Sequence, residues 1–287
     1  MREKTTPFLR NLLENTSISK QYLIAEQPED IENNYNDPLM EDKHEVVKGL
    51  IHKYKNRALV KVSYQCAAHC RFCTRIRQIG NPEGTLKSDE IDNIVEYLIN
   101  HPEIDDVILS GGDPLYTPKL TYEILLKIKE IESIKVIRIG TRMPFQSPKS
   151  FESPVFLELF NLIKTIQLTK PFYILVHIEH PAEIVPESIA AIKILKELNV
   201  TLLSQTVFLK DINDDEVVLE KMFKKLYYLG VMPYYLYHCD NVKGLEHFIV
   251  QKEKEKEIAQ KLRTLLSGIA TPLLVEDLEN GYGKIPI

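Results

Sequence analysis

From residue 58 onward, short runs of apolar and β-branched residues alternate with segments whose apolar residues recur every three or four positions. The short runs predict strands at residues 58–64, 106–109, 134–139, 172–178, 200–209, 233–239 and 272–276. Helical spacing lies between them, as at Ile91, Ile94, Val95 and Leu98, in a helix predicted to begin with Ser88 as its N-cap. Strand and helix repeated at about 30 residues per unit favour right-handed parallel crossovers, and therefore an α/β sheet covered by helices.

Such a sheet can curl into a full or partial barrel, or stay open and doubly wound. The barrel is favoured because the residues that carry chemistry follow the C-terminal ends of successive predicted strands, and in an α/β barrel those ends face one site. Residues 1–57 break the rhythm with a polar stretch at 29–36 and a turn at Asp37-Pro38-Leu39 before a short helical segment. We therefore predict an N-terminal helical extension over residues 1–57, packed on a barrel domain over residues 58–287.

Composition narrows the class of protein. The chain has 287 residues, of which 44% are hydrophobic, so it can bury a sizeable core. Its 36 basic and 41 acidic residues are interspersed, which argues against a nucleic-acid or membrane-surface partner. The sequence lacks an apolar run of the roughly 18 residues that a membrane helix needs, and its N-terminus does not resemble a signal peptide. We therefore expect a cytoplasmic protein that acts on a small molecule.

Three of the four cysteines, Cys66, Cys70 and Cys73, lie close together in C-x3-C-x2-C spacing, and Cys239 lies far away. Such clustered thiols in a cytoplasmic protein indicate metal ligands rather than disulfides. Three thiolates suit a four-iron cluster, which would keep one iron open for an external ligand, whereas structural zinc closes its shell with four protein ligands. A zinc site completed by His69 or Cys239 is the alternative.

The cysteine motif resembles that of the radical S-adenosylmethionine (radical SAM) superfamily. In that superfamily the open iron of a [4Fe-4S] cluster binds S-adenosylmethionine. The reduced cluster and this cofactor together yield a 5′-deoxyadenosyl radical, which abstracts a hydrogen from an unactivated carbon. After the second predicted strand, Gly111, Gly112 and Asp113 resemble the motif that holds the methionine amino group. The fuller sequence Ser-Gly-Gly-Asp-Pro-Leu is similar to that of the lysine 2,3-aminomutase family. Further segments match the family in order, namely Asp37-Pro38-Leu39, Cys73-Thr74-Arg75, His180-Pro181, Asn213-Asp214, Glu246-His247-Phe248 and Gly283-Lys284-Ile285-Pro286.

The resemblance implies a second cofactor, pyridoxal 5′-phosphate. Lys284 matches the lysine that binds this cofactor covalently, and the glycine-containing segment 279–283 before it would let the backbone approach the phosphate. A lysine with this role must be partly neutral, and burial favours the neutral form by lowering its pKa. We therefore predict that Lys284 lies in a buried C-terminal tail.

The resemblance also implies roles for residues that bind substrate. Asp240 and Asp277 match the pair that holds the distal ammonium of lysine, and Arg75 matches the ligand of the substrate carboxylate. Two carboxylates at one point favour a cationic amino-acid tail, because a buried ammonium is costly unless it is paired. Arg142 and Gln205 are weaker candidates for binding a cofactor in the pocket.

These features predict an isomerase that converts L-lysine into β-lysine by 2,3-migration of the amino group. The alternatives are a radical SAM aminomutase for another amino acid, arginine or glutamate, and a non-catalytic iron–sulfur or zinc-binding protein. We expect an electron donor such as flavodoxin or ferredoxin, and the short form suggests a functional link to modification of elongation factor P. Because the sequence ends at Ile287, without the zinc-binding extension of some members, we carry over neither zinc nor an oligomeric state.

Overall fold

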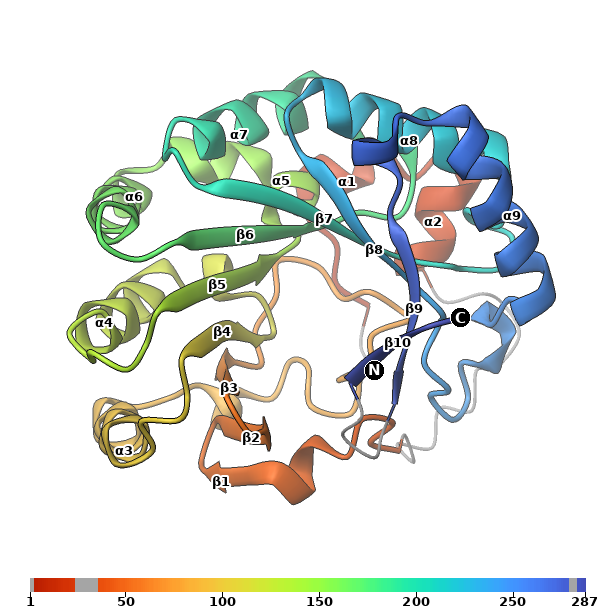
Figure 1. The fold of residues 1–287 in the computed structure, drawn as a ribbon. Helices are drawn as coiled ribbons and strands as arrows, with labels where there is room; N and C mark the ends of the chain where they lie inside the picture. Colours follow the sequence, from red (N-terminus) through yellow and green to blue (C-terminus); the bar gives the residue numbers. More distant parts are fainter. Residues whose placement is uncertain (1–2, 24–35, 279–282) are drawn as a thin grey trace.

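The computed structural model describes residues 3–23, 36–278 and 283–287, and in it ten strands form one curved sheet in chain order (Figure 1). The strands are β1 (Glu45–Val47), β2 (Leu50–Tyr54), β3 (Arg57–Ser63), β4 (Asp106–Gly111), β5 (Val136–Thr141), β6 (Phe172–His177), β7 (Thr201–Val207), β8 (Met232–Tyr237), β9 (Leu273–Leu278) and β10 (Gly283–Pro286). From β3 to β9 all neighbours pair in parallel, and β1, β2 and β10 add antiparallel strands at the two edges. This is a partial α/β barrel, which confirms the predicted fold class.

The seven predicted strands correspond to β3 to β9, and the predicted and observed ends differ by at most two residues. Along these strands, fully buried side chains alternate with less buried ones, and this pattern made the strands recognisable in the sequence. On β4, for example, Val107 and Leu109 are fully buried and Ile108 and Ser110 less so. One face of each strand therefore packs against the helices, and the other face lines the inside of the barrel.

Helices cover the outer face of the sheet (Figure 1). They are α3 (Ser88–Asn100), α4 (Pro118–Ile128), α6 (Pro154–Gln167), α7 (Pro186–Lys196), α8 (Glu216–Tyr228) and α9 (Lys252–Leu265). The short helix α5 (Met143–Gln146) instead follows the end of β5, and its Gln146 reaches the cysteine loop. In α3 the apolar residues Ile91, Ile94 and Leu98 are fully buried, and burial of each such side chain contributes about 1.5–3 kcal/mol. The predicted N-cap of α3 is wrong by one residue. Lys87 takes that position, and the Ser88 hydroxyl instead donates a hydrogen bond to Glu123.

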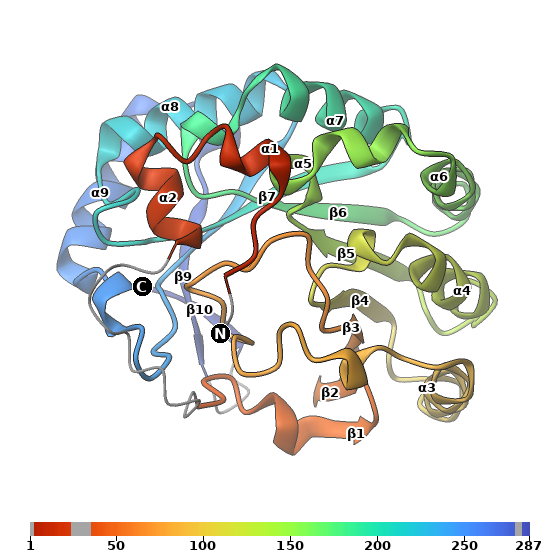
Figure 2. The same ribbon diagram turned by 180° about the vertical axis from the view of Figure 1, so that it is seen from behind.

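The N-terminal part of the chain contributes both helices and strands. The helices α1 (Pro7–Arg10) and α2 (Thr16–Tyr22) lie over one end of the barrel, in front of β7 in Figure 2. The expectation of a helical extension over residues 1–57 is nevertheless incomplete, because β1 and β2 continue the sheet beyond β3. Most of the polar stretch 29–36 lies outside the described residues, and the division at residue 57 stays a prediction. Within the described ranges, no helix is long and apolar enough to cross a membrane.

Candidate active site

The cysteine loop, residues 64–75, follows β3 and contains no helix or strand. Backbone hydrogen bonds tie it to the N-terminal segment, from His69 N–H to the Lys4 carbonyl (3.0 Å) and from Arg71 N–H to the Gln21 carbonyl (2.9 Å). The Lys4 ammonium also donates to the Cys66 carbonyl at 2.6 Å. The segment that contains α1 and α2 therefore fixes the backbone from which the three thiols project.

The three thiols of this loop lie within electrostatic reach of one another. Burial raises the pKa of Cys66, Cys70 and Cys73, and the charges of neighbouring thiols contribute to the rise at Cys66 and Cys73; the net result for Cys73 is a pKa of about 11. Bonds to a metal would remove this cost, because coordinated thiols are deprotonated. The buried site therefore fits a positively charged iron–sulfur centre better than three free thiols.

The alternative of a single zinc ion has less support. Among the described residues, no three His, Cys, Asp or Glu side chains are placed to share one metal ion. A cluster does not require such convergence, because each cysteine binds a different iron. Burial also raises the pKa of Cys239, and the charges that raise it further are those of Asp240, Glu179 and Glu255 rather than those of the three loop thiols.

The glycine motif at the end of β4 packs directly against the cysteine loop. A Cβ atom at Gly111 would lie 2.5 Å from the Ser63 carbonyl oxygen, and one at Gly112 would lie 2.3 Å from that of Gln65. Gly111 also has a φ of 108°, a conformation that side chains disfavour. Both positions therefore require glycine, and the close approach leaves the backbone of this motif beside the three cysteines.

The Asp113 carboxylate is buried and already has hydrogen-bond partners. It accepts from the Thr141 hydroxyl at 2.8 Å and from Arg142 N–H at 2.7 Å. Burial raises the pKa of Asp113, and these hydrogen bonds oppose the shift. In this structure Asp113 joins the ends of β4 and β5, and its predicted contact with S-adenosylmethionine stays a prediction.

Arg75 forms a two-point ion pair with Glu41, a partner that the sequence did not indicate. Its Nε and Nη2 atoms donate to the Glu41 carboxylate at 2.7 and 2.6 Å, and Nη1 donates to Ser110 Oγ (3.2 Å) and the Gly111 carbonyl (3.3 Å). Burial alone would raise the pKa of Glu41, but the charge and hydrogen bonds of Arg75 lower it. Arg75 thus lies beside the glycine motif, and its role toward a substrate carboxylate stays a prediction.

Lys284 lies opposite Asp277 in the β9–β10 hairpin, and its ammonium donates to the Asp277 carboxylate at 2.8 Å. Tyr54 Oη also donates to Asp277 (3.5 Å), and the Lys284 ammonium lies 5.7 Å from the centre of the Tyr237 ring. Burial and the charge of Asp277 raise the pKa of Asp240 to about 7, while Lys284 and a nearby histidine lower it. Asp240, Asp277 and Lys284 therefore form one electrostatic group, which we call the Lys284 cluster.

The predicted burial of Lys284 needs correction, because its side chain is 29% exposed. The segment 279–282 that precedes it lies outside the described residues. β10 pairs with β9 and is the last strand of the sheet, so within the described residues no strand pairs with its other edge. Lys284 is therefore half-buried in an ion pair.

Sequence reasoning missed an aromatic and basic wall beside this cluster. The Arg57 guanidinium lies 4.0 Å from the centre of the Tyr54 ring, and a Cβ atom at Gly283 would lie 3.5 Å from Arg57. The Gln205 amide donates to Tyr237 Oη at 2.8 Å, which connects this predicted residue to the cluster through Tyr237. An arginine next to the backbone before Lys284 suits a phosphate group, so the residues present fit a phosphorylated cofactor bound to that lysine. Nothing in the sequence distinguished Arg57 from other charged residues.

The predicted site residues thus fall into two groups along one edge of the sheet. The cysteine loop, the glycine motif and Arg142 follow β3, β4 and β5, and Arg75 joins them. The Lys284 cluster comes from the end of β9, from β10 and from the segment after β8. Because the carboxyl ends of parallel strands meet at one edge, both groups face the region where such barrels place their sites.

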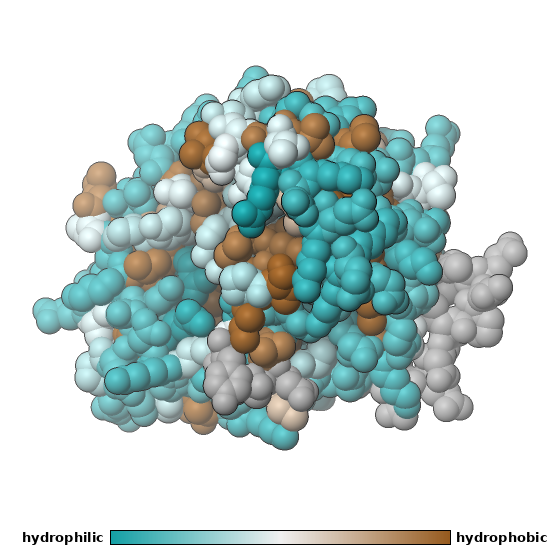
Figure 3. All heavy atoms as spheres, turned by 45° about the vertical axis from the view of Figure 1, so that its right-hand side comes forward, coloured by the Kyte–Doolittle hydropathy of each residue, from teal (hydrophilic) through white to brown (hydrophobic). Residues whose placement is uncertain are grey.

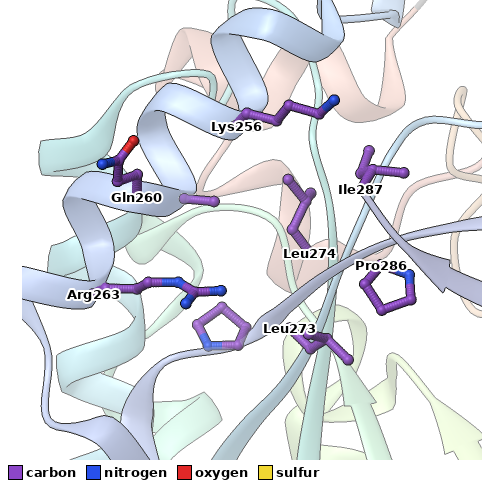
Figure 4. Close-up of a pocket in the computed structure, with 9 residues that line it drawn as sticks. Lys256, Gln260, Arg263, Leu273, Leu274, Pro286 and Ile287 are labelled. Carbon is purple, nitrogen blue, oxygen red and sulfur yellow. The ribbon is translucent and has the colours of Figure 1, made fainter.

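A surface hollow of about 420 Å³ lies apart from these groups, between α9 and the ends of β9 and β10. Figure 4 shows its lining, with Lys256, Gln260 and Arg263 on α9 facing Leu273, Leu274, Pro286 and Ile287. Figure 3 shows hydrophobic surface in a recess near the centre of the view, with hydrophilic surface beside it. None of the lining residues is a predicted site residue, so this hollow is not the candidate site.

Comparisons with known proteins agree with this geometry. The family model "Radical SAM superfamily" matches residues 60–221, which include the cysteine loop and the glycine motif. The fold is similar to that of a radical SAM methyltransferase from Sphaerobacter thermophilus, with a TM-score of 0.52 and 19% identity over 79% of this chain and 68% of that one. At this identity the likeness is one of fold, and together with the family match it defines a radical SAM protein.

Sequence relatives show which family within the radical SAM superfamily the chain belongs to. The chain is 35% identical to the L-lysine 2,3-aminomutase of Clostridium subterminale, over all of this chain and 69% of that protein. It is 37% identical to the L-lysine 2,3-aminomutase of Escherichia coli, over 88% of this chain and 71% of that protein. The enzyme of the same name from Fusobacterium nucleatum is 38% identical over 88% of this chain, which spans 58% of that relative's length. The chain belongs to the lysine 2,3-aminomutase family.

Proposed function

We propose that the protein is a radical SAM, pyridoxal-phosphate-dependent aminomutase that converts L-lysine into β-lysine. The observation that carries the choice of substrate is the Lys284 cluster, in which a lysine ammonium already occupies the Asp277 carboxylate at 2.8 Å with Asp240 nearby. That ammonium stands in for the distal ammonium of a substrate lysine. The proposal places the substrate tail at these two carboxylates when Lys284 is engaged with its cofactor.

The negative charges of Asp240 and Asp277 support a preference for a substrate with a cationic tail. Burying an ammonium costs several kcal/mol unless it is paired, and two carboxylates offset that cost where one would do so only in part. Burial and Asp277 raise the pKa of Asp240 to about 7, so a cationic ligand would favour its ionised form. An acidic side chain such as that of glutamate would be repelled. A guanidinium would satisfy the same charges, so arginine must be separated from lysine by experiment.

The chain offers distinct residues for each cofactor. Cys66, Cys70 and Cys73 would hold the cluster, the glycine motif would bind S-adenosylmethionine, and Lys284 with Arg57 would hold pyridoxal phosphate. When bound, these groups would supply hydrogen abstraction from an unactivated carbon and a covalent carrier for the migrating nitrogen.

The protein's own part is placement. Arg75 would receive the substrate carboxylate through Nη1, because Nε and Nη2 hold Glu41. Nη1 now contacts Ser110 Oγ and the Gly111 carbonyl, at the glycine motif. A carboxylate at Arg75 and an ammonium at the Lys284 cluster would fix both ends of a lysine, so that its α- and β-carbons lie between them.

Electron supply and location complete the proposal. The cluster would take single electrons from a donor such as flavodoxin or ferredoxin. A functional link to elongation factor P and a cytoplasmic location also stay predictions.

A substrate panel tests the proposal. The protein would be purified without oxygen, reconstituted with iron and sulfide, and incubated with reductant, S-adenosylmethionine, pyridoxal phosphate and L-lysine, L-arginine or L-glutamate. We expect a β-amino product from lysine alone, which disappears when any cofactor is omitted. Lys284→Ala should abolish the product and the absorbance of bound pyridoxal phosphate, whereas Lys243→Ala, at an exposed position, should preserve both. Turnover of arginine instead of lysine, or full turnover by Lys284→Ala, would contradict the proposal.

A further inference from the structure

Two side chains donate hydrogen bonds to the sulfur of one loop cysteine. Arg142 Nη1 lies 2.9 Å from Cys70 Sγ, and Gln146 Nε2 lies 3.3 Å from it. Both residues belong to the turn and short helix after β5, more than 70 positions from the cysteine in sequence. Among the described residues, no such side-chain hydrogen bond to the sulfur of Cys66 or Cys73 is seen.

The charge of Arg142 is held in place by buried partners. Its side chain is 5% exposed and pairs with the fully buried Glu183 at 3.0 Å. Nη2 also donates to Gln21, and the guanidinium lies 5.3 Å from the ring centres of both Tyr22 and Phe72. Water does not screen a charge in such surroundings as it would at the surface. The site therefore places a fixed positive charge, with a fixed counter-charge behind it, against one cluster ligand.

We infer that Arg142 and Gln146 are positioning residues that set the reduction potential of the cluster bound through Cys70. This inference rests on the proposed function, because it needs the cluster. Reduction adds one electron, supplied by the external donor, and so one negative charge. A cation and N–H donors at a cysteine sulfur stabilise the more negative, reduced state and raise the potential.

Arg142 also connects this tuning to the glycine motif. Its backbone N–H donates to the Asp113 carboxylate at 2.7 Å, while its side chain donates to Cys70. One residue thus contacts both the cluster ligand and the segment predicted to bind S-adenosylmethionine. The arrangement suits a cluster that must reach its reduced state next to that cofactor.

The ion pair with Glu183 allows a test in which the sign of the effect is diagnostic. Removing Arg142 alone would leave Glu183 buried without its partner and risk unfolding, so both partners are changed together in Arg142→Met/Glu183→Gln. This double variant removes the cation and its N–H donors from Cys70. Glu183→Gln alone removes only the counter-charge and leaves the cation. A tuning role therefore predicts shifts in opposite directions, which a loosened structure would not produce.

The measurement is a redox titration of the reconstituted proteins, followed by the electron paramagnetic resonance signal of the reduced cluster. At a fixed solution potential, we expect the double variant to lower the ratio of reduced to oxidised cluster about tenfold, or about 59 mV for a one-electron couple. Glu183→Gln should raise that ratio. Arg138→Gln is the matched control, because Arg138 lies on β5 in an ion pair with Asp106 (2.7 Å), four residues and about 13 Å at strand spacing before Arg142, which follows the strand. Its potential should equal that of the wild type.

Each outcome separates the inference from the proposed function. A wild-type protein that assembles no cluster would overturn both. Three results with a normally assembled cluster would overturn the inference alone. The reduction potential could be unchanged in the double variant, it could shift in the same direction in the double variant and in Glu183→Gln, or it could shift as much in Arg138→Gln as in the double variant. If circular dichroism shows that the double variant does not fold, Gln146→Leu carries the test. It removes one N–H donor and must lower the potential, and an unchanged potential would overturn the inference.

Discussion

Replacing Asp240 with asparagine should stabilise the ligand-free protein at pH 8 and change its stability little at pH 4. Burial and the charge of Asp277 raise the pKa of Asp240 from 3.8 to about 7 in the folded protein, whereas in the unfolded chain the carboxyl returns to its ordinary value. A raised folded-state pKa means that the group's contribution to stability is fully present below about pH 4 and is lost as the pH rises through 7. Asparagine cannot ionise and therefore avoids this loss.

The magnitude follows from the shift of about three pKa units. Each unit corresponds to about 1.36 kcal/mol, so the full effect at pH 8 is at most about 4 kcal/mol. Asp240 retains some contact with solvent, which lowers the expected value to about 2–4 kcal/mol. For a chain of this length, 1 kcal/mol shifts the melting temperature by about 2 °C, so Asp240→Asn should melt about 4–8 °C higher than the wild type at pH 8.

Thermal unfolding by circular dichroism at pH 4, 5, 6, 7 and 8 tests this expectation on the reduced, ligand-free proteins. Asp211→Asn is the matched control, since it makes the same chemical change at a side chain that is 67% exposed. The difference in Tm between Asp240→Asn and wild type should grow between pH 4 and 7 and then level off, while Asp211→Asn shows no such trend. A pH-independent difference, or one that shrinks as the pH rises, would refute the reasoning about Asp240.

Three further predictions concern metal, substrate and packing. Cys73→Ala should lose most of its bound iron after reconstitution, whereas Cys239→Ala should retain the wild-type iron content; equal iron in the two variants would contradict the assignment of ligands. Because a substrate ammonium requires ionised Asp240, the KM for lysine should rise about tenfold per pH unit below 7, and Asp240→Asn should remove this slope; a slope that persists in the variant would assign the titration to another group. Glu41→Ala should lower the free energy of unfolding in urea by about 3–5 kcal/mol, because it leaves Arg75 buried without its partner; a loss below 1 kcal/mol would show that this ion pair contributes little.

Strands were predictable where one face packs against helices. β3 to β9 carry fully buried apolar residues such as Val60, Leu109 and Ile174, and these runs are visible in the sequence. β1 and β2 were missed because they are short, three and five residues long, and because β1 has no buried position and β2 has only two. Leu50 and Ile51 do point into the structure, but two apolar residues are too few to distinguish a strand from a turn.

Local motifs were predictable in the candidate site, and long-range partners were not. The cysteine loop and the glycine motif are each one continuous segment of the sequence. Their proximity in space follows from their places after the adjacent strands β3 and β4. The Arg75–Glu41 pair joins residues 34 positions apart, and the Arg142–Cys70 contact joins residues 72 apart. Such contacts depend on how the N-terminal segment and the turn after β5 pack on the barrel, which no spacing rule specifies.

The position of the amino nitrogen in the product tests the central claim most directly. The reconstituted enzyme would be incubated with L-lysine labelled with ¹⁵N at its α-amino group, and the product would be examined by NMR and mass spectrometry. The account predicts β-lysine that retains the ¹⁵N label, now bonded to C3 of the same molecule. Unchanged lysine despite an intact cluster and cleaved S-adenosylmethionine, or a product with the label still on C2, would contradict it.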